Sequence, residues 1–144
     1  MLRQDDWQKS KLVDVMWQHG SIYGGHQAAC IIGSCIMNRV RAGWSANAIT
    51  AIASIPKFAA SSVVPVYEIP SMFDPAFIRI LSEVGAIYEG TKNYASAKGP
   101  AGPPMSALYW CDSRRIDTPF FREKILLDPS HKRIVEMNTL ACYT

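Results

Sequence analysis

The segment from residue 26 to residue 41 constrains the fold more than any other part of the chain. Its apolar residues recur at helical spacing and cover most of the surface of such a helix: Ala28, Ile31, Ile32, Cys35, Ile36 and Val40. A helix that is apolar on most sides has to be covered by other elements. Gly43 is a natural end for it. The segment therefore predicts a domain built around one central helix.

A first helix is predicted before this segment. Asp5 or Asp6 can cap its start, and one apolar stripe follows at helical spacing, made of Leu12, Val15, Met16 and His19. Gly20 and the pair Gly24–Gly25 are expected to break this helix, because glycine is a poor helix former. The sequence thus predicts a glycine-rich connection between the first helix and the central one.

Two further helices are expected after the central one. Ser45 or Asn47 can cap a short third helix that runs through residue 55. Asp74–Pro75 is a strong start for a fourth, with aspartate at the N-cap and proline at the first helical position. Gly90 is expected to end it. The proline-rich residues 56–73 are predicted to be mostly loop.

The last third of the chain predicts the only β structure. Residues 107–111 and 139–143 each read as a short strand, and the two are expected to pair. Residues 90–106 form a glycine- and proline-rich loop, and Asp117–Pro119 opens a last helix that runs to about residue 127. We therefore predict a single domain over residues 1–144, mainly α (α+β), with a small two-stranded β element.

Composition limits the partners. The chain has 144 residues, a formal charge of +3 and a pI near 8.7, which is too weakly basic to predict nucleic-acid binding but suits an anionic envelope polymer. Residues 1–6 lack an apolar stretch, so no signal peptide is expected. The longest apolar stretch, residues 28–37, is too short to span a membrane. No cofactor is predicted.

The cysteines and histidines do not predict a metal site. None of the cysteines forms a CxxC pair, and the three histidines do not supply zinc-ligand spacing: the residues are Cys30, Cys35, Cys111, Cys142, His19, His26 and His131. Buried, reduced thiols are the prediction. A disulfide between Cys111 and Cys142 is the alternative.

One ordered set of segments carries a family resemblance. Residues 16–21 (MWQHGS), the Gly24–Gly25 pair and the helix ending in Asn38-Arg39-Val40 are followed by four shorter landmarks, at residues 56–58 (PKF), 107–110 (ALYW), 118–121 (TPFF) and 137–140 (MNTL). In this order the segments resemble the SleB-type cell-wall hydrolases, a lysozyme-like family of spore-cortex and phage enzymes, over roughly residues 10–143. The resemblance implies a lysozyme-like fold, peptidoglycan or other virion proteins as partners, and synthesis in a host cytoplasm with a place in a virion.

The same resemblance exposes a missing acid. The family carries a catalytic glutamate at the end of its first helix, where this chain has Gln18 and His19, and no acidic residue occurs between Asp14 and Glu68. Glycosidic cleavage needs a carboxyl group with a raised pKa beside the scissile oxygen. An amide such as Gln18 cannot supply that proton. Lys57 replaces the glutamine of the family's facing motif.

The resemblance also outlines a substrate groove, which would be lined by Gln18, His19, Lys57, Phe58, Tyr109 and Trp110. No catalytic residue is identified, although His19, Glu68 and Asp112 are candidate replacement acids. The structural alternative for His19 is packing at a helix end, and Arg39 is expected to be structural. Since Tyr109 and Trp110 alternate along a strand, one should point inward and the other toward the cleft.

Three functions follow from these observations. The first is a peptidoglycan-directed protein of lysozyme-like fold that has lost its chemistry, either binding the cell wall or serving as a non-catalytic virion component. The second is an active glycan hydrolase with a non-standard acid. The third is an unrelated helical binding module. The substitutions at Gln18, His19 and Lys57 favour the first.

Overall fold

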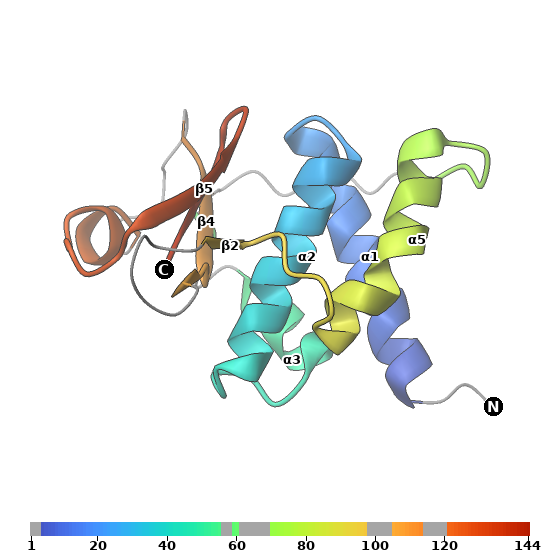
Figure 1. Ribbon diagram of the computed structural model, residues 1–144, viewed down its shortest axis with the longest axis horizontal. Coiled ribbons are helices and arrows are strands. Elements are labelled where there is room, and N and C mark those ends of the chain that lie inside the picture. Colours follow the sequence, from blue (N-terminus) through green and yellow to red (C-terminus); the bar gives the residue numbers. More distant parts are fainter. Residues whose placement is uncertain (1–3, 56–58, 61–69, 98–104, 114–120) are drawn as a thin grey trace.

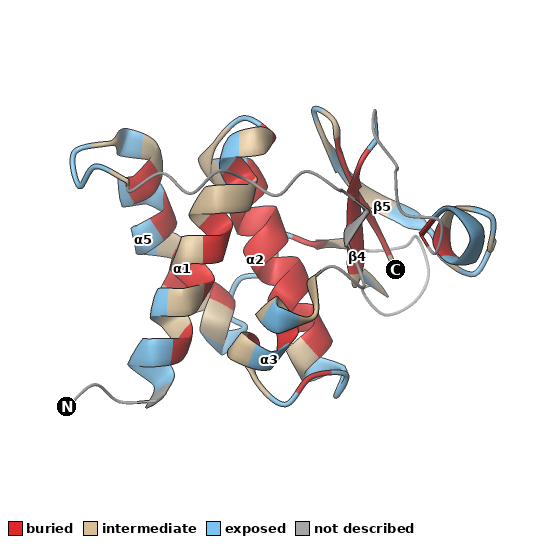
Figure 2. Ribbon diagram, turned by 180° about the vertical axis from the view of Figure 1, so that it is seen from behind, coloured by how far each residue is buried: buried red, intermediate tan, exposed pale blue. Residues whose placement is uncertain are grey.

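Helix α2 (His26–Arg41) is the central element of the fold. In the computed structural model, every one of its residues from 28 to 39 is buried. Helices α1 (Gln4–Ile22) and α5 (Pro75–Glu89) pack on one side of α2, and the β-sheet lies on the other (Figure 1). Figure 2 shows the buried surface concentrated on α2 and on the strand that faces it. The prediction of a buried central helix is confirmed. The structure describes residues 4–55, 59–60, 70–97, 105–113 and 121–144.

Two glycines allow α1 and α2 to pack closely. A Cβ atom at Gly20 would lie 2.5 Å from the Cβ of Ala29, and one at Gly33 would lie 2.6 Å from the sulfur of Met16. The predicted break at Gly20 is therefore wrong, because α1 continues through this residue to Ile22. Gly20 serves the packing of two helices, and the cost of glycine within a helix is offset by that contact.

The chain turns sharply between α1 and α2. Gly24 and Gly25 both adopt positive φ angles, of 109° and 124°, which residues with a side chain rarely adopt. The amide of Gly25 donates to the carbonyl of Gly20 at 3.1 Å and so closes the turn. The predicted glycine-rich connection is confirmed at these two residues.

The other helix ends agree well with the sequence. Asn47 caps α3 (Ala48–Ala53) by accepting a hydrogen bond from the amide of Thr50, whereas Ser45 is not the cap. Asp74 caps α5 in the same way, and Gly90 ends α5 with a φ of 85°. These caps set where α3 and α5 begin, and both helices pack against the α1–α2 pair.

The main sheet has four strands in the order β1-β4-β6-β5. The predicted strands pair as expected, since β4 (Tyr109–Asp112) runs antiparallel to β6 (Leu140–Tyr143). The sheet is nevertheless larger than the predicted two-stranded element, because β5 (Arg133–Met137) adds to β6 and β1 (Ala59–Ala60) adds to β4 in parallel. The fold class, mainly helical α+β, is confirmed.

Two smaller elements complete the described chain. Strands β2 (Ser96–Ala97) and β3 (Met105–Ser106) form a separate antiparallel pair within the segment predicted as a loop. The π-helix η1 (Arg122–Leu126) occupies the end of the predicted last helix, whose start at residues 117–120 lies outside the described residues. No helix in the described part of the chain has both the length and the hydropathy to cross a membrane. All four cysteines are buried and free, as predicted.

Side chains from the end of α2 attach it to the strands. The amide nitrogen of Asn38 donates to the carbonyls of Ala95 and Ala107 at 3.1 and 3.0 Å. The guanidinium of Arg39 donates to the carbonyl of Leu108 at 2.7 Å. Both side chains satisfy backbone groups that would otherwise be buried without a partner. The expected structural role of Arg39 agrees with this contact, and the pair fixes α2 against the start of β4.

Candidate functional site

The end of α1 lies against the centre of the sheet. The imidazole of His19 meets the indole of Trp110 edge-on, with ring centroids 5.9 Å apart and an interplanar angle of 75°. Trp110 is only 1% exposed. Burial lowers the pKa of His19 from its ordinary value of 6.5, so the ring is neutral at neutral pH. His19 therefore acts as a packing residue at the end of α1.

The rest of the predicted groove is only partly described. Gln18 is half-buried on α1, and its backbone carbonyl accepts a hydrogen bond from the hydroxyl of Ser21 at 2.9 Å. Lys57 and Phe58, the predicted opposite wall, and Glu68, a candidate acid, lie outside the described residues. Among the predicted groove residues that the structure describes, it brings His19 into contact with Trp110.

Tyr109 and Trp110 lie on opposite faces of β4. Trp110 faces α1, whereas Tyr109 packs within an aromatic cluster with Phe121, His131 and Trp44 at centroid distances of 6.2, 5.3 and 5.9 Å. Both strand residues are buried, so neither forms an open groove wall. Trp44 is the exposed member of the cluster, with half of its surface accessible.

One carboxylate lies close to the turn that follows α1. Asp112, the last residue of β4, is 8% exposed. After burial itself, the charge of Asp112 is the main cause of the raised pKa of Tyr23, which lies in this turn. Tyr23 is anchored there through its backbone carbonyl, which accepts a hydrogen bond from the side-chain amide of Asn138 at 3.1 Å. Asp112 is therefore a candidate carboxylate that the structure places near the turn after α1.

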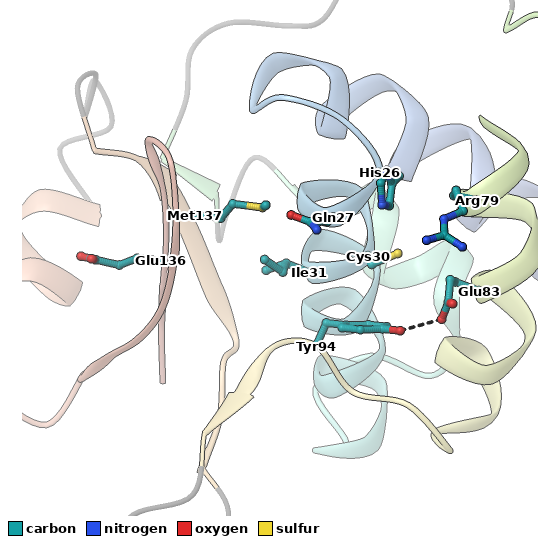
Figure 3. Close-up of a pocket in the computed structure, with 9 residues that line it drawn as sticks. All are labelled: His26, Gln27, Cys30, Ile31, Arg79, Glu83, Tyr94, Glu136 and Met137. Carbon is teal, nitrogen blue, oxygen red and sulfur yellow. Dashed lines mark hydrogen bonds between the residues drawn. The ribbon is translucent and has the colours of Figure 1, made fainter. Parts of the chain in front are cut away.

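A cavity of about 350 Å³ opens between the helices and the sheet (Figure 3). Its lining comes from α2, α5, the segment after α5, and β5: His26, Gln27, Cys30, Ile31, Arg79, Glu83, Tyr94, Glu136 and Met137. The volume falls in the lower part of the range of about 300–1,000 Å³ that is typical of small-ligand sites. The cavity shares no residue with the predicted groove.

Hydrogen bonds hold one wall of this cavity. Tyr94 donates its hydroxyl to the carboxylate of Glu83 at 2.6 Å, and the ammonium of Lys92 approaches the same carboxylate at 3.1 Å. These two donors lower the pKa of Glu83, which keeps the group ionised. The backbone amide of Tyr94 also donates to the buried hydroxyl of Ser34. Glu83 is thus a structural acceptor that positions the tyrosine ring and not a proton donor.

The opposite rim carries polar side chains without partners. Within the part of the chain that the structure describes, the side chains of His26, Gln27 and Arg79 make no hydrogen bond or ion pair. Figure 3 shows the guanidinium of Arg79 on the α5 side, between His26 and Glu83. Glu136 points away from the cavity and pairs with Arg133. The cavity therefore offers a guanidinium, an imidazole and a side-chain amide to a ligand.

Cys30 does not make the cavity a nucleophilic site. Its side chain is only 4% exposed, and burial raises the pKa of its thiol to about 11. The thiolate is the reactive form of cysteine, and at neutral pH little of it is present here. Although His26 precedes Cys30 by one helical turn, the pair lacks the lowered thiol pKa that a catalytic cysteine needs.

Comparisons with known proteins give no relative. No protein-family model matches the chain, and no match was found among curated proteins or among solved structures.

The cavity was missed at the level of sequence, although two signals point to it. His26 and Gln27 are polar residues at the start of an otherwise apolar helix, and Arg79 and Glu83 are spaced by four on the polar side of the next long helix. Neither signal shows that the two helices face a common space. That relationship depends on how α2 and α5 pack.

Proposed function

We propose that the protein is a peptidoglycan-directed protein of lysozyme-like fold that binds the cell wall without cleaving its glycan. The family resemblance supplies the target and a phage origin, with a place in the virion as a wall-binding or assembly component. One structural observation supports the proposed loss of glycan cleavage. The helix end at which the resemblance expects an acid holds His19, a half-buried residue whose ring packs edge-on against Trp110 and whose pKa burial lowers.

The chemistry of glycan cleavage explains why this observation matters. The leaving oxygen has to receive a proton from a group that is protonated at working pH and touches the bond. Gln18 has no such proton, and burial lowers the pKa of His19, so its protonated form is scarce at neutral pH. The imidazole of His19 also packs against Trp110, which restrains it from approaching a substrate. Neither residue suits the role of general acid.

Charge supports a binding role. The formal charge of +3 favours association with an anionic wall polymer, and the cavity beside α2 offers a built space for part of such a polymer. A bound polymer would not need an acid or a nucleophile in that space. Binding without cleavage is the function that agrees with both features.

The test combines retention and cleavage. The purified protein is incubated with insoluble peptidoglycan, the bound fraction is measured after sedimentation, and zymography and reducing-sugar release are measured across acidic to alkaline pH. We expect retention that weakens as salt is added, with no clearing and no sugar release. Glycan cleavage by the wild-type chain would show that the proposal of lost chemistry is wrong. Absence of retention would exclude the wall as its target.

An active hydrolase is the second candidate, and Asp112 is the observation that favours it. This buried carboxylate lies close to Tyr23 in the turn after α1. If cleavage is detected, Asp112→Asn should abolish it, whereas Asp6→Asn, a matched change at an exposed position in the first turn of α1, should not. Equal activity of both variants would exclude Asp112 as the acid.

A further inference from the structure

We infer that the cavity between α2, α5 and β5 binds the free carboxylate end of a short peptide. The inference rests on the proposed function in one respect, since it takes the peptide part of peptidoglycan as the source of that ligand. The cavity, its charge and its hydrogen-bonding groups are observations that stand apart from the family resemblance.

The local charge favours a monoanion. Arg79 and Lys92 contribute two positive charges and Glu83 one negative charge, which leaves one net positive charge at the cavity. Glu136 does not change this sum, because it points away and is paired with Arg133. Lys92 is already paired with Glu83, so among the described residues the positive charge that lacks an ion pair is that of Arg79. A single carboxylate would balance it.

The geometry of the donors suits a carboxylate and the peptide group next to it. A guanidinium presents parallel N–H groups that match the two oxygens of a carboxylate. Gln27 carries both a donor and an acceptor, as a peptide group requires. Figure 3 shows Gln27 on the opposite side of the cavity from Arg79, so the two could contact successive groups of one ligand. Both side chains lack partners within the described residues.

The floor suits a small apolar side chain. Ile31, Cys30 and the thioether of Met137 face the same space as the polar rim. The ring of Tyr94 forms a wall that is held by Glu83 and Ser34 before any ligand binds. A wall ordered in advance reduces the entropy lost on binding. An alanine-like methyl group fits such a floor better than a sugar ring bearing many hydroxyls.

The direct test is a titration followed by NMR shifts or calorimetry. The probe is acetyl-D-alanyl-D-alanine, and the comparison probes are its carboxy-terminal amide, the all-L peptide and inorganic phosphate. We expect the acid to shift residues of α2 and α5 and to bind at least about tenfold more tightly than the amide. Arg79→Gln should weaken the acid at least about tenfold and leave the amide unchanged. Equal binding of acid and amide, or phosphate binding more tightly than both, would overturn the inference.

A matched variant controls for net charge and folding. Lys124→Gln removes one positive charge from η1, which lies at the opposite end of the molecule from α5 (Figure 1), and it should bind the acid like the wild type. Arg79 is exposed, so its replacement should leave the melting temperature within a degree or two of the wild type. If Lys124→Gln weakens binding as much as Arg79→Gln does, the effect is general charge and the inference is wrong.

The two proposals fail in different ways. Binding of the protein is compared on intact peptidoglycan and on glycan strands from which the peptides have been removed by an amidase. Both proposals are supported if the protein is retained on intact peptidoglycan, if retention falls when the peptides are removed, and if Arg79→Gln also reduces it. Peptide binding without wall retention would overturn the proposed function alone. Wall retention that neither peptide removal nor Arg79→Gln changes would overturn the cavity inference alone.

Discussion

The imidazole of His19 and the indole of Trp110 form an edge contact with ring centroids 5.9 Å apart. The contact joins the end of α1 to the middle of β4, and it does so at the helix end where the family resemblance expects a catalytic carboxyl group. His19 instead links the helical layer to the sheet through its contact with Trp110.

This contact predicts a pH-dependent stability. Burial lowers the pKa of His19 below 6.5, so the unfolded state binds a proton that the folded state resists as the pH falls through and below that value. The free energy of unfolding should therefore decline on mild acidification. His19→Gln should lower stability at neutral pH by about 0.5–1.5 kcal/mol through loss of the ring contact and should show a shallower acid decline. Urea denaturation at several pH values measures both, and parallel pH profiles would contradict the prediction.

The helix crossing predicts opposite effects for two glycine substitutions. Gly20→Ala would place a Cβ atom 2.5 Å from that of Ala29, so the helices would have to move apart, at a cost of about 1–3 kcal/mol. Gly85→Ala adds a Cβ within α5 where nothing lies within 4 Å, and alanine there should stabilise by up to about 1 kcal/mol. Denaturant midpoints of the two variants measure the difference. Equal midpoints would show that the α1–α2 approach is not close.

Replacing the side-chain amide of Asn38 is expected to lower the free energy of unfolding strongly. Its nitrogen serves the buried carbonyls of Ala95 and Ala107, so Asn38→Asp replaces a shared donor by an acceptor that faces two acceptors. We expect a loss of about 2–5 kcal/mol at neutral pH, since each unsatisfied buried group costs about 1–3 kcal/mol. Asn47→Ala, which removes only a helix cap, should cost about 1 kcal/mol. Amide exchange should also rise at the start of β4 in the Asn38 variant alone.

The buried thiols predict resistance to modification. Burial raises the thiol pKa to about 11 for Cys30 and Cys111 and to about 12 for Cys142. Ellman's reagent should therefore react slowly with the folded protein at mildly alkaline pH and with all four thiols after denaturation. A rapid reaction of one thiol in the folded state would contradict this prediction.

The same pKa shifts predict a loss of stability at alkaline pH. The thiols ionise near pH 9 when unfolded but only at about 11 or above when folded, so the unfolded state binds fewer protons between these values. The contribution of the protonated thiols to the free energy of unfolding is fully present below pH 9. It is lost as the pH rises through the pKa that the thiols have in the folded state. Urea denaturation at rising pH should show this decline, and Cys111→Ser should reduce its slope.

Much of the fold could be predicted from local patterns. The apolar period of residues 28–40 predicted a central helix, and the caps Asn47 and Asp74 marked the starts of α3 and α5. These features depend on neighbours within a few residues, which a sequence shows directly. The prediction failed at Gly20, where the expected break is a contact with Ala29 from the next helix. A glycine that ends a helix and a glycine that allows a second helix to pack closely have the same local conformational preference. The sequence around Gly20 therefore could not distinguish the two roles.

The candidate site depends more than the helices do on contacts between residues that are far apart in the sequence. The strand alternation of Tyr109 and Trp110 was predicted, but the burial of both depended on Phe121 and α1, which approach from either side. β5 was missed because its pattern of burial is irregular at the edge of the sheet. The cavity residues Gln27 and Arg79 lie more than fifty positions apart, and only packing brings them together.

The sequence by itself determined that this chain folds around one apolar helix, that its first two helices are joined through Gly24 and Gly25, and that no carboxyl group stands between Asp14 and Glu68. These are properties of composition and spacing. Only the tertiary structure decided that His19 is a neutral packing residue. It also decided that Arg79 lies beside a cavity, where its side chain makes no hydrogen bond or ion pair with the residues that the structure describes. The reason is physical, because burial and pairing depend on which side chains approach from other elements.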